Sequence, residues 1–153
     1  MIVTKTAFGQ SATSSANAVI IQPLSIVKTA DMNFGNLLAG ATSGTIILST
    51  DGLRTASGGV SLPAVSGTVS SAKFVVNATH KFRLISIPTS ITLTRVGGGG
   101  TMTVNTFTSV PALFANNNSG IQEIRLGARL NVPANQASGQ YVSGNFTVTV
   151  NFF

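Results

Sequence analysis

Apolar and polar side chains alternate strictly over residues 146–152, and Phe153 follows them. Neighbouring side chains on a β-strand point to opposite faces, so the alternation predicts a strand over residues 146–153. One face carries Phe146, Val148, Val150 and Phe152, and the other carries Thr147, Thr149 and Asn151. The apolar face has to be covered, and the far edge of the strand has to pair with an earlier segment or with another molecule.

The same period of two recurs along most of the chain, and no window of a dozen residues keeps the apolar spacing of a helix. Strands are also predicted over residues 18–28, 45–49, 59–62, 73–78, 82–87, 90–96, 101–107 and 123–132. Shared apolar faces are expected for Phe74 with Val76, for Met102 with Val104, and for Ile124, Leu126, Ala128, Leu130 and Val132. Pro23 interrupts the first of these strands, because proline cannot donate to a ladder.

Turn signals separate the predicted strands. The dipeptide Asp51-Gly52 is favoured in two-residue hairpin turns, and we expect a local contact there between Asp51 and Arg54. The run Gly97 to Gly100 predicts a flexible hairpin loop, since it lacks the Lys-Ser or Lys-Thr of a phosphate-binding loop. About eight to ten short strands separated by turns indicate an antiparallel β-sandwich.

The first seventeen residues differ from the rest, because they are rich in Ser, Ala and Thr. We expect an extended N-terminal arm over residues 1–17, a candidate donor strand, and a β-sandwich domain over residues 18–153. The candidate subunit-interface residues of the arm are Ile2, Val3, Phe8, Ala12 and Ala16. The candidate groove and terminal-strand residues are Phe146, Val148, Val150 and Phe152.

The composition favours a protein outside the cell. Charged residues are only 8% of the chain, about a third of the usual share, and Ser, Thr, Asn and Gly take the solvent-facing positions. The chain contains no cysteine, so neither a disulfide framework nor a thiolate metal site is available. No stretch approaches the ~18 to 20 apolar residues of a membrane helix. The first ten residues lack the apolar region of a signal peptide, so we expect export by a leader that is not present in this chain.

Few side chains are able to carry out chemistry. The chain has one histidine and three acidic residues, so no catalytic residue, metal site or cofactor site is predicted. Weak Ca²⁺ binding through backbone carbonyls is an alternative that the residues leave open. His80 is interpreted as a solvated turn residue, far in sequence from Asp31, Asp51 and Glu123. The net charge of +6 comes from scattered Lys and Arg without an aromatic stacking platform, so we expect no nucleic-acid partner.

Short sequence words occur in order along these strands. They are Pro23-Leu24-Ser25-Ile26, Asp31-Met32-Asn33-Phe34-Gly35, Asp51-Gly52-Leu53-Arg54, Gly58-Gly59-Val60, Ala72-Lys73-Phe74, Thr101-Met102-Thr103-Val104, Gly127-Ala128-Arg129-Leu130 and the stretch from Ala134 to Tyr141. Their order and spacing resemble the bacterial family of secreted surface proteins catalogued as domain of unknown function 4402. The resemblance implies an exported, immunoglobulin-like β-sandwich with a Greek-key, pilin-like topology. It also implies an ending similar to that of fimbrial subunits, in which Phe152 is the penultimate aromatic.

Two functions follow as hypotheses. The first is a structural subunit of an extracellular pilus-like filament, a homopolymer formed when the arm of one subunit adds as a strand to its neighbour. The second is a monomeric surface binding module or adhesin domain that contacts a host or cell surface. An enzyme is not expected.

Overall fold

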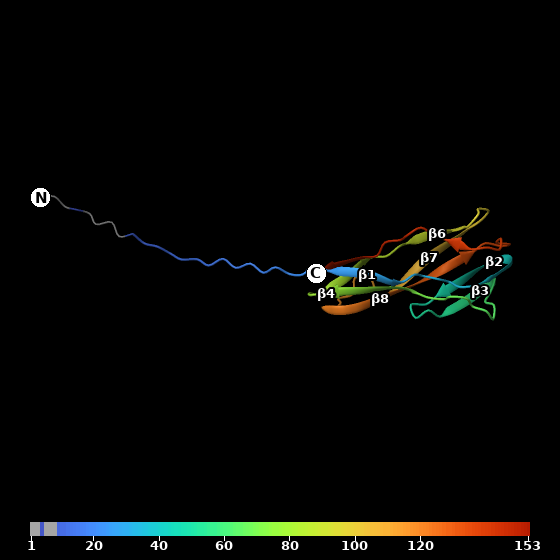
Figure 1. Ribbon diagram of the computed structural model, residues 1–153, viewed down its shortest axis with the longest axis horizontal. Helices are drawn as coiled ribbons and strands as arrows, with labels where there is room; N and C mark the ends of the chain where they lie inside the picture. Colours follow the sequence, from blue (N-terminus) through green and yellow to red (C-terminus); the bar gives the residue numbers. More distant parts are fainter. Residues whose placement is uncertain (1–3, 5–8) are drawn as a thin grey trace.

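The computed structural model describes residue 4 and residues 9–153 of the chain (Figure 1). This part is all-β and antiparallel and contains no helix. The strands are β1 (Ser25–Ala30), β2 (Leu38–Leu48), β3 (Arg54–Ser61), β4 (Ala72–Ala78), β5 (Phe82–Ser86), β6 (Ser90–Arg95), β7 (Thr101–Val110), β8 (Gly120–Val132), β9 (Tyr141–Val142) and β10 (Thr149–Phe152). The all-β class predicted from the alternation is confirmed.

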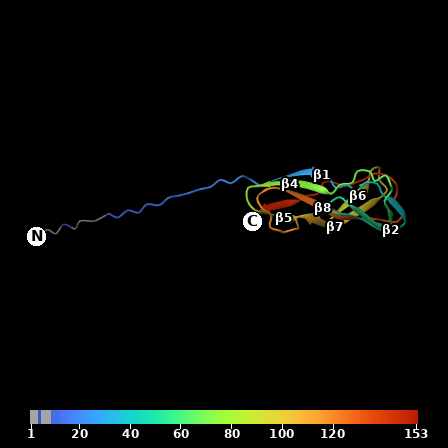
Figure 2. The ribbon, with the colours of Figure 1, turned by 90° about the horizontal axis from the view of Figure 1, so that it is seen from below.

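The strands form an elongated body, and residues 9–23 run away from one end of it. Both views show this stretch continuing the long axis of the body, and both place the C-terminus at the end from which it leaves (Figures 1 and 2). We call residues 9–23 the N-terminal segment. No residue of this segment belongs to a strand.

One long strand organises the larger sheet. This sheet has eight strands, in which β1, β4, β8, β7, β6 and β9 follow one another and β2 pairs with both β3 and β8. Along one edge of β8, residues 120–126 pair with β4 and residues 128–132 pair with β2. Gly127 therefore lies where β8 changes partner. The second sheet contains only β5 and β10.

The core consists of two hydrophobic clusters. Cluster A contains Phe34, Ile46, Leu48, Val60, Met102, Val104, Ala128, Leu130 and Val132. Cluster B contains Ala72, Phe74, Val76, Ala78, Phe82, Leu84, Ile124, Leu126 and Val148. Side chains of β8 enter both clusters, on either side of Gly127. The predicted faces of β4, β7 and β8 are confirmed, because every residue expected on them is at most 8% exposed.

The hairpin between β2 and β3 forms where the turn signal predicts, but its loop is longer. Thr50, Asp51 and Gly52 lie between Ser49 and Leu53, and the amide of Ser49 donates to the carbonyl of Leu53 at 2.8 Å. Gly52 has a φ of 83°, in the left-handed region that glycine adopts without strain. A turn followed by a left-handed residue is the usual three-residue hairpin loop, so the prediction of a two-residue turn was wrong.

The predicted contact between Asp51 and Arg54 was also wrong. Arg54 Nη1 instead donates to the carbonyl oxygens of Phe34 and Asn36, the latter at 2.7 Å. Asp51 binds Arg125 of β8. Both charged groups thus find partners on segments distant in sequence, which local spacing does not reveal. The hairpin predicted at Gly97 to Gly100 does join β6 to β7.

The first predicted strand begins later than expected. β1 starts at Ser25, after Pro23, and pairs with β4 through residue 30. Residues 18–24, which were predicted as part of that strand, carry no strand. The apolar, β-branched run before Pro23 favours a strand locally, but it finds no partner in the described part of the chain.

Candidate assembly interface

The terminal strand packs as its alternation predicts. Val148 is buried in cluster B, and Phe146, Val150 and Phe152 are partly buried against it. The intervening side chains of Thr147, Thr149 and Asn151 are exposed. The ladder is shorter than predicted, because β10 pairs with β5 only from Thr149 to Phe152. The four candidate groove residues therefore share one face, and this face borders cluster B.

Contacts on the β5 side fix the end of the chain. The ring of Phe152 meets the ring of His80 edge to face, with 5.8 Å between centroids. The guanidinium of Arg83 lies 4.1 Å from the ring centroid of Phe153. Arg83 belongs to β5, the strand that pairs with β10. These contacts therefore lie along one edge of β10, and we call the opposite edge its outer edge.

Two strand edges near cluster B have no partner among the described residues. β1 pairs only with β4, and β10 pairs only with β5. Residues 143–148, which lead into β10, make no backbone hydrogen bond to any other residue that the structure describes. Unpaired edge groups of this kind are a template for pairing with another chain.

The N-terminal segment is exposed throughout, and it carries three large apolar side chains just before Gln22. Val19, Ile20 and Ile21 are 88%, 99% and 49% exposed. Its one hydrogen bond to the body joins the hydroxyl of Thr79 to the carbonyl of Gln22 at 3.3 Å. Three consecutive large apolar residues at such exposure are a surface that water disfavours.

The candidate arm residues divide into two groups. Ala12 and Ala16 are described, and both are exposed. Ile2, Val3 and Phe8 lie outside the described residues. Sequence reasoning assigned Ala18 and Ile20 to a strand, and the structure instead leaves both exposed and outside every strand.

The few reactive side chains are spread over the surface of the body. His80 is exposed in the turn between β4 and β5, as predicted, and its Nδ1 lies 3.0 Å from the hydroxyl of Thr79. Asp31 pairs with Lys28 at 2.6 Å. The described residues contain no group of three side chains suited to hold a metal ion. None of them forms a helix of the length and apolarity that crossing a bilayer requires.

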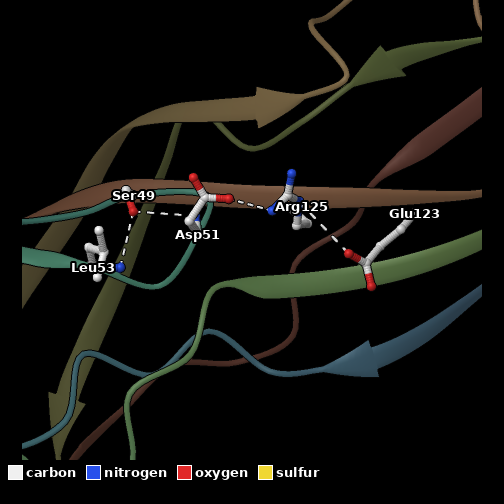
Figure 3. Close-up of polar contacts among 5 residues, drawn as sticks. All are labelled: Ser49, Asp51, Leu53, Glu123 and Arg125. Atoms are coloured by element: carbon white, nitrogen blue, oxygen red, sulfur yellow. Dashed lines mark hydrogen bonds and ion pairs between the residues drawn. The ribbon is translucent and has the colours of Figure 1, made fainter.

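Asp51 belongs to an ion-pair group that ties the β2–β3 hairpin to β8 (Figure 3). Arg125 binds Asp51, and its Nε lies 3.8 Å from Glu123 Oε1. The side chains of Asp51 and Glu123 are 63% and 47% exposed, so water and salt screen both pairs. The group links the tip of this hairpin to β8.

Replacing Asp51 with asparagine should therefore change stability little. Exposed ion pairs contribute about 0–1 kcal/mol, so we expect the free energy of unfolding of Asp51→Asn to fall by less than about 1 kcal/mol. Urea unfolding at low and at high salt measures this. A loss well above that value, or one unaffected by salt, would mean that the hairpin depends on this contact.

A large hollow on the surface also lacks reactive groups. It has a volume of about 510 Å³ and is lined by Ser43, Gly44, Thr45, Ser57, Gly58, Thr101, Met102, Thr103, Asn131, Val132 and Pro133. Six of these eleven residues carry a hydroxyl or amide group, and none of the eleven has a side chain that titrates near neutral pH.

Comparison with known proteins gives one match. No curated protein and no solved structure matches the chain. The model of one family matches residues 24–152, which is well over half of the chain. The match begins one residue before β1 and ends on the last residue of β10. The chain therefore belongs to the family described as Domain of unknown function (DUF4402).

Proposed function

We propose that the protein is a structural subunit of an extracellular pilus-like filament. Each subunit gives its N-terminal segment as an added β-strand to the sheet of the next. The observation that carries this proposal is an exposed apolar run, Val19 to Ile21, on a segment outside every strand, in a body that also has unpaired strand edges. One copy thus has both an apolar segment that pairs with no sheet and sheet edges that pair with no further strand in the described residues.

The physics of strand addition supports a durable joint. Main-chain hydrogen bonds along the edge supply affinity, and pockets for alternate side chains supply specificity. Burying one isoleucine side chain contributes about 1.5–3 kcal/mol before ordering costs. Such a contact joins different surfaces of the two copies. Heterologous contacts that do not close on themselves produce open filaments.

The finer description of the fold belongs to the same proposal. We assign the body to the immunoglobulin-like β-sandwich class with a pilin-like topology. Cluster B supports this, because it joins side chains of β4 and β8 in one sheet to those of β5 in the other. Tyr141 gives further support, since its hydroxyl donates to the carbonyl of Ala137 at 2.7 Å. A tyrosine bonded to backbone a few residues upstream is a feature of sandwich corners.

The proposal includes an extracellular location and no catalytic role. A surface with few charges and many hydroxyl groups supports the location. The scatter of His80, Asp31 and Asp51 over separate turns supports the absence of catalysis, because general acid–base chemistry needs such groups within hydrogen-bond reach of one another.

Removing residues 1–21, which include most of the N-terminal segment, tests the proposed function. A chain lacking residues 1–21 keeps Gln22, whose carbonyl accepts the hydroxyl of Thr79. We expect the intact chain to form filaments in negative-stain electron microscopy and the shortened chain to form none. The shortened chain should melt within about 3 °C of the intact monomer, because the deleted residues that the structure describes are exposed.

Two results would contradict the proposal. Filaments that persist without residues 1–21 would remove the role of the N-terminal segment. An intact chain that stays monomeric in size-exclusion chromatography over a wide concentration range would instead favour a self-contained binding module or adhesin.

A further inference from the structure

The unpaired backbone beside cluster B indicates where a neighbouring copy adds its strand. We propose that the N-terminal segment of a second copy pairs with the outer edge of residues 145–152 and runs antiparallel to β10. This inference rests on the proposed function. It adds to that function the edge that accepts the strand and the direction in which the strand runs.

The acceptor edge is continuous along the end of the chain. From Thr149 to Phe152 one edge of the strand is paired with β5, and the outer edge has no partner in the described residues. Just before it, residues 143–148 have no backbone partner on either side within the described part of the chain. Phe146 and Val148 nevertheless keep the alternation of β10 and pack against cluster B. The side chains of residues 145–148 therefore already alternate as they would on a strand, although the structure assigns no strand to them.

The N-terminal segment has the pattern of a strand that fits beside this edge. Ala12, Ser14, Ala16, Ala18 and Ile20 fall on one face, and Ser11, Thr13, Ser15, Asn17, Val19 and Ile21 fall on the other. Small side chains suit the first of these faces, because Phe146, Val150 and Phe152 of the acceptor already pack against cluster B beside it. An extended strand rises about 3.4 Å per residue, so residues 9–21 span about 44 Å and the acceptor stretch about 27 Å. The segment is therefore longer than the stretch that it would pair with.

The direction follows from where the chain ends lie. β1 begins, and β10 finishes, at the end of the body from which the N-terminal segment leaves (Figures 1 and 2). β1 therefore runs away from that end and β10 runs towards it. In a filament whose copies repeat head to tail along the long axis, every copy has the same orientation. The donated segment then runs in the direction of β1 in the acceptor, which is antiparallel to its β10.

The opposite direction would give a different assembly. A copy turned end for end would lay its segment parallel to β10 and could receive the first copy's segment in return. Such a reciprocal exchange closes a dimer and stops growth. In the head-to-tail arrangement a strand on the outer edge of β1 would be parallel to β1, and parallel pairs are slightly less stable per residue. Growth and ladder stability both favour the antiparallel edge at β10.

Disulfide cross-linking in the full chain tests the edge and the direction together. The chain has no cysteine of its own, so introduced thiols react only with each other. One cysteine is placed in the N-terminal segment, as Ser11→Cys, Ser15→Cys or Val19→Cys, and one in the terminal strand, as Thr147→Cys or Asn151→Cys. All five side chains are exposed in the structure. Each double variant is assembled, oxidised and run on a non-reducing gel.

We expect ladders of covalent multimers that follow an antiparallel order. The segment position that links best to Asn151→Cys should lie about four residues before the one that links best to Thr147→Cys, since the paired strands rise equally. The reverse order, covalent dimers without ladders, or an intramolecular link that leaves a monomer would overturn the inference. Filaments whose segment links only to Val27→Cys or Thr29→Cys in β1 would also overturn it while leaving the proposed function standing. An unmodified chain that forms no filaments would remove the proposed function itself.

Discussion

Replacing Gly127 with alanine will strongly destabilise the body. A Cβ atom at this position would lie 2.8 Å from the carbonyl carbon of Ser49 and 2.9 Å from the amide nitrogen of Thr50, and closer still to the carbonyl oxygen of Leu48. All three atoms belong to the backbone, so they cannot move aside as the end of a side chain can. Forcing extra atoms into a packed interior costs about 1–3 kcal/mol, occasionally more.

The position of Gly127 makes the effect larger than local crowding alone. β8 changes its partner from β4 to β2 at this residue. The residue before it, Leu126, packs in cluster B, and the residue after it, Ala128, packs in cluster A. A shift of the β2 end would loosen the ladder to β8 and the packing of Leu48, which is fully buried. At roughly 2–4 °C per kcal/mol for a chain of this size, the melting temperature of Gly127→Ala should fall by about 5–10 °C.

Gly144 provides the matched control. No atom lies within 4 Å of a Cβ built there, and its φ is not in the left-handed region. Gly144→Ala should change the free energy of unfolding by at most about 0.5 kcal/mol. Thermal melts followed by circular dichroism compare the two variants. If Gly127→Ala melted with the parent chain, β8 would not need a glycine at its change of partner.

The sequence predicts the strands well wherever one face is buried. The alternation places Ile124, Leu126 and Leu130 on a buried face of β8, and the structure agrees, because side-chain period and burial are linked directly. The alternation does not reveal that β8 serves two partners, since pairing depends on segments far apart in the chain. The role of Gly127 follows from that pairing, so it was not predicted.

The candidate interface was predicted only in part, for a related reason. Phe146, Val148, Val150 and Phe152 share a face next to cluster B, as their spacing indicates. The run from Ala18 to Ile21 was assigned to a core strand, because β-branched apolar residues favour strands wherever a partner exists. Propensity is a property of the residues themselves, whereas a partner is a property of the fold. A strand-like run without a partner is the feature from which we infer assembly.

Replacing Ile20 with aspartate should block assembly without weakening the isolated subunit. Ile20 is 99% exposed, so its loss removes almost no contact from the monomer. In the proposed joint between subunits, the side chain of Ile20 points towards the acceptor subunit, on the same side of the donated strand as Ala16 and Ala18. Losing the burial of one isoleucine weakens the joint by about 1.5–3 kcal/mol, or roughly 10- to 100-fold in affinity. A buried, unpaired carboxylate adds a further penalty.

Val19 is the matched control, because it is adjacent, β-branched, 88% exposed and on the opposite face of the predicted strand. Val19→Asp introduces the same charge, but in the joint it points towards solvent. We expect Val19→Asp to form filaments near the parent's critical concentration, and Ile20→Asp to need at least about ten times more protein, measured by sedimentation and electron microscopy. Equal loss in both variants would mean that charge alone prevents assembly. Equal tolerance would mean that Ile20 stays exposed in the filament, and the apolar face of the N-terminal segment would then have no role in joining subunits.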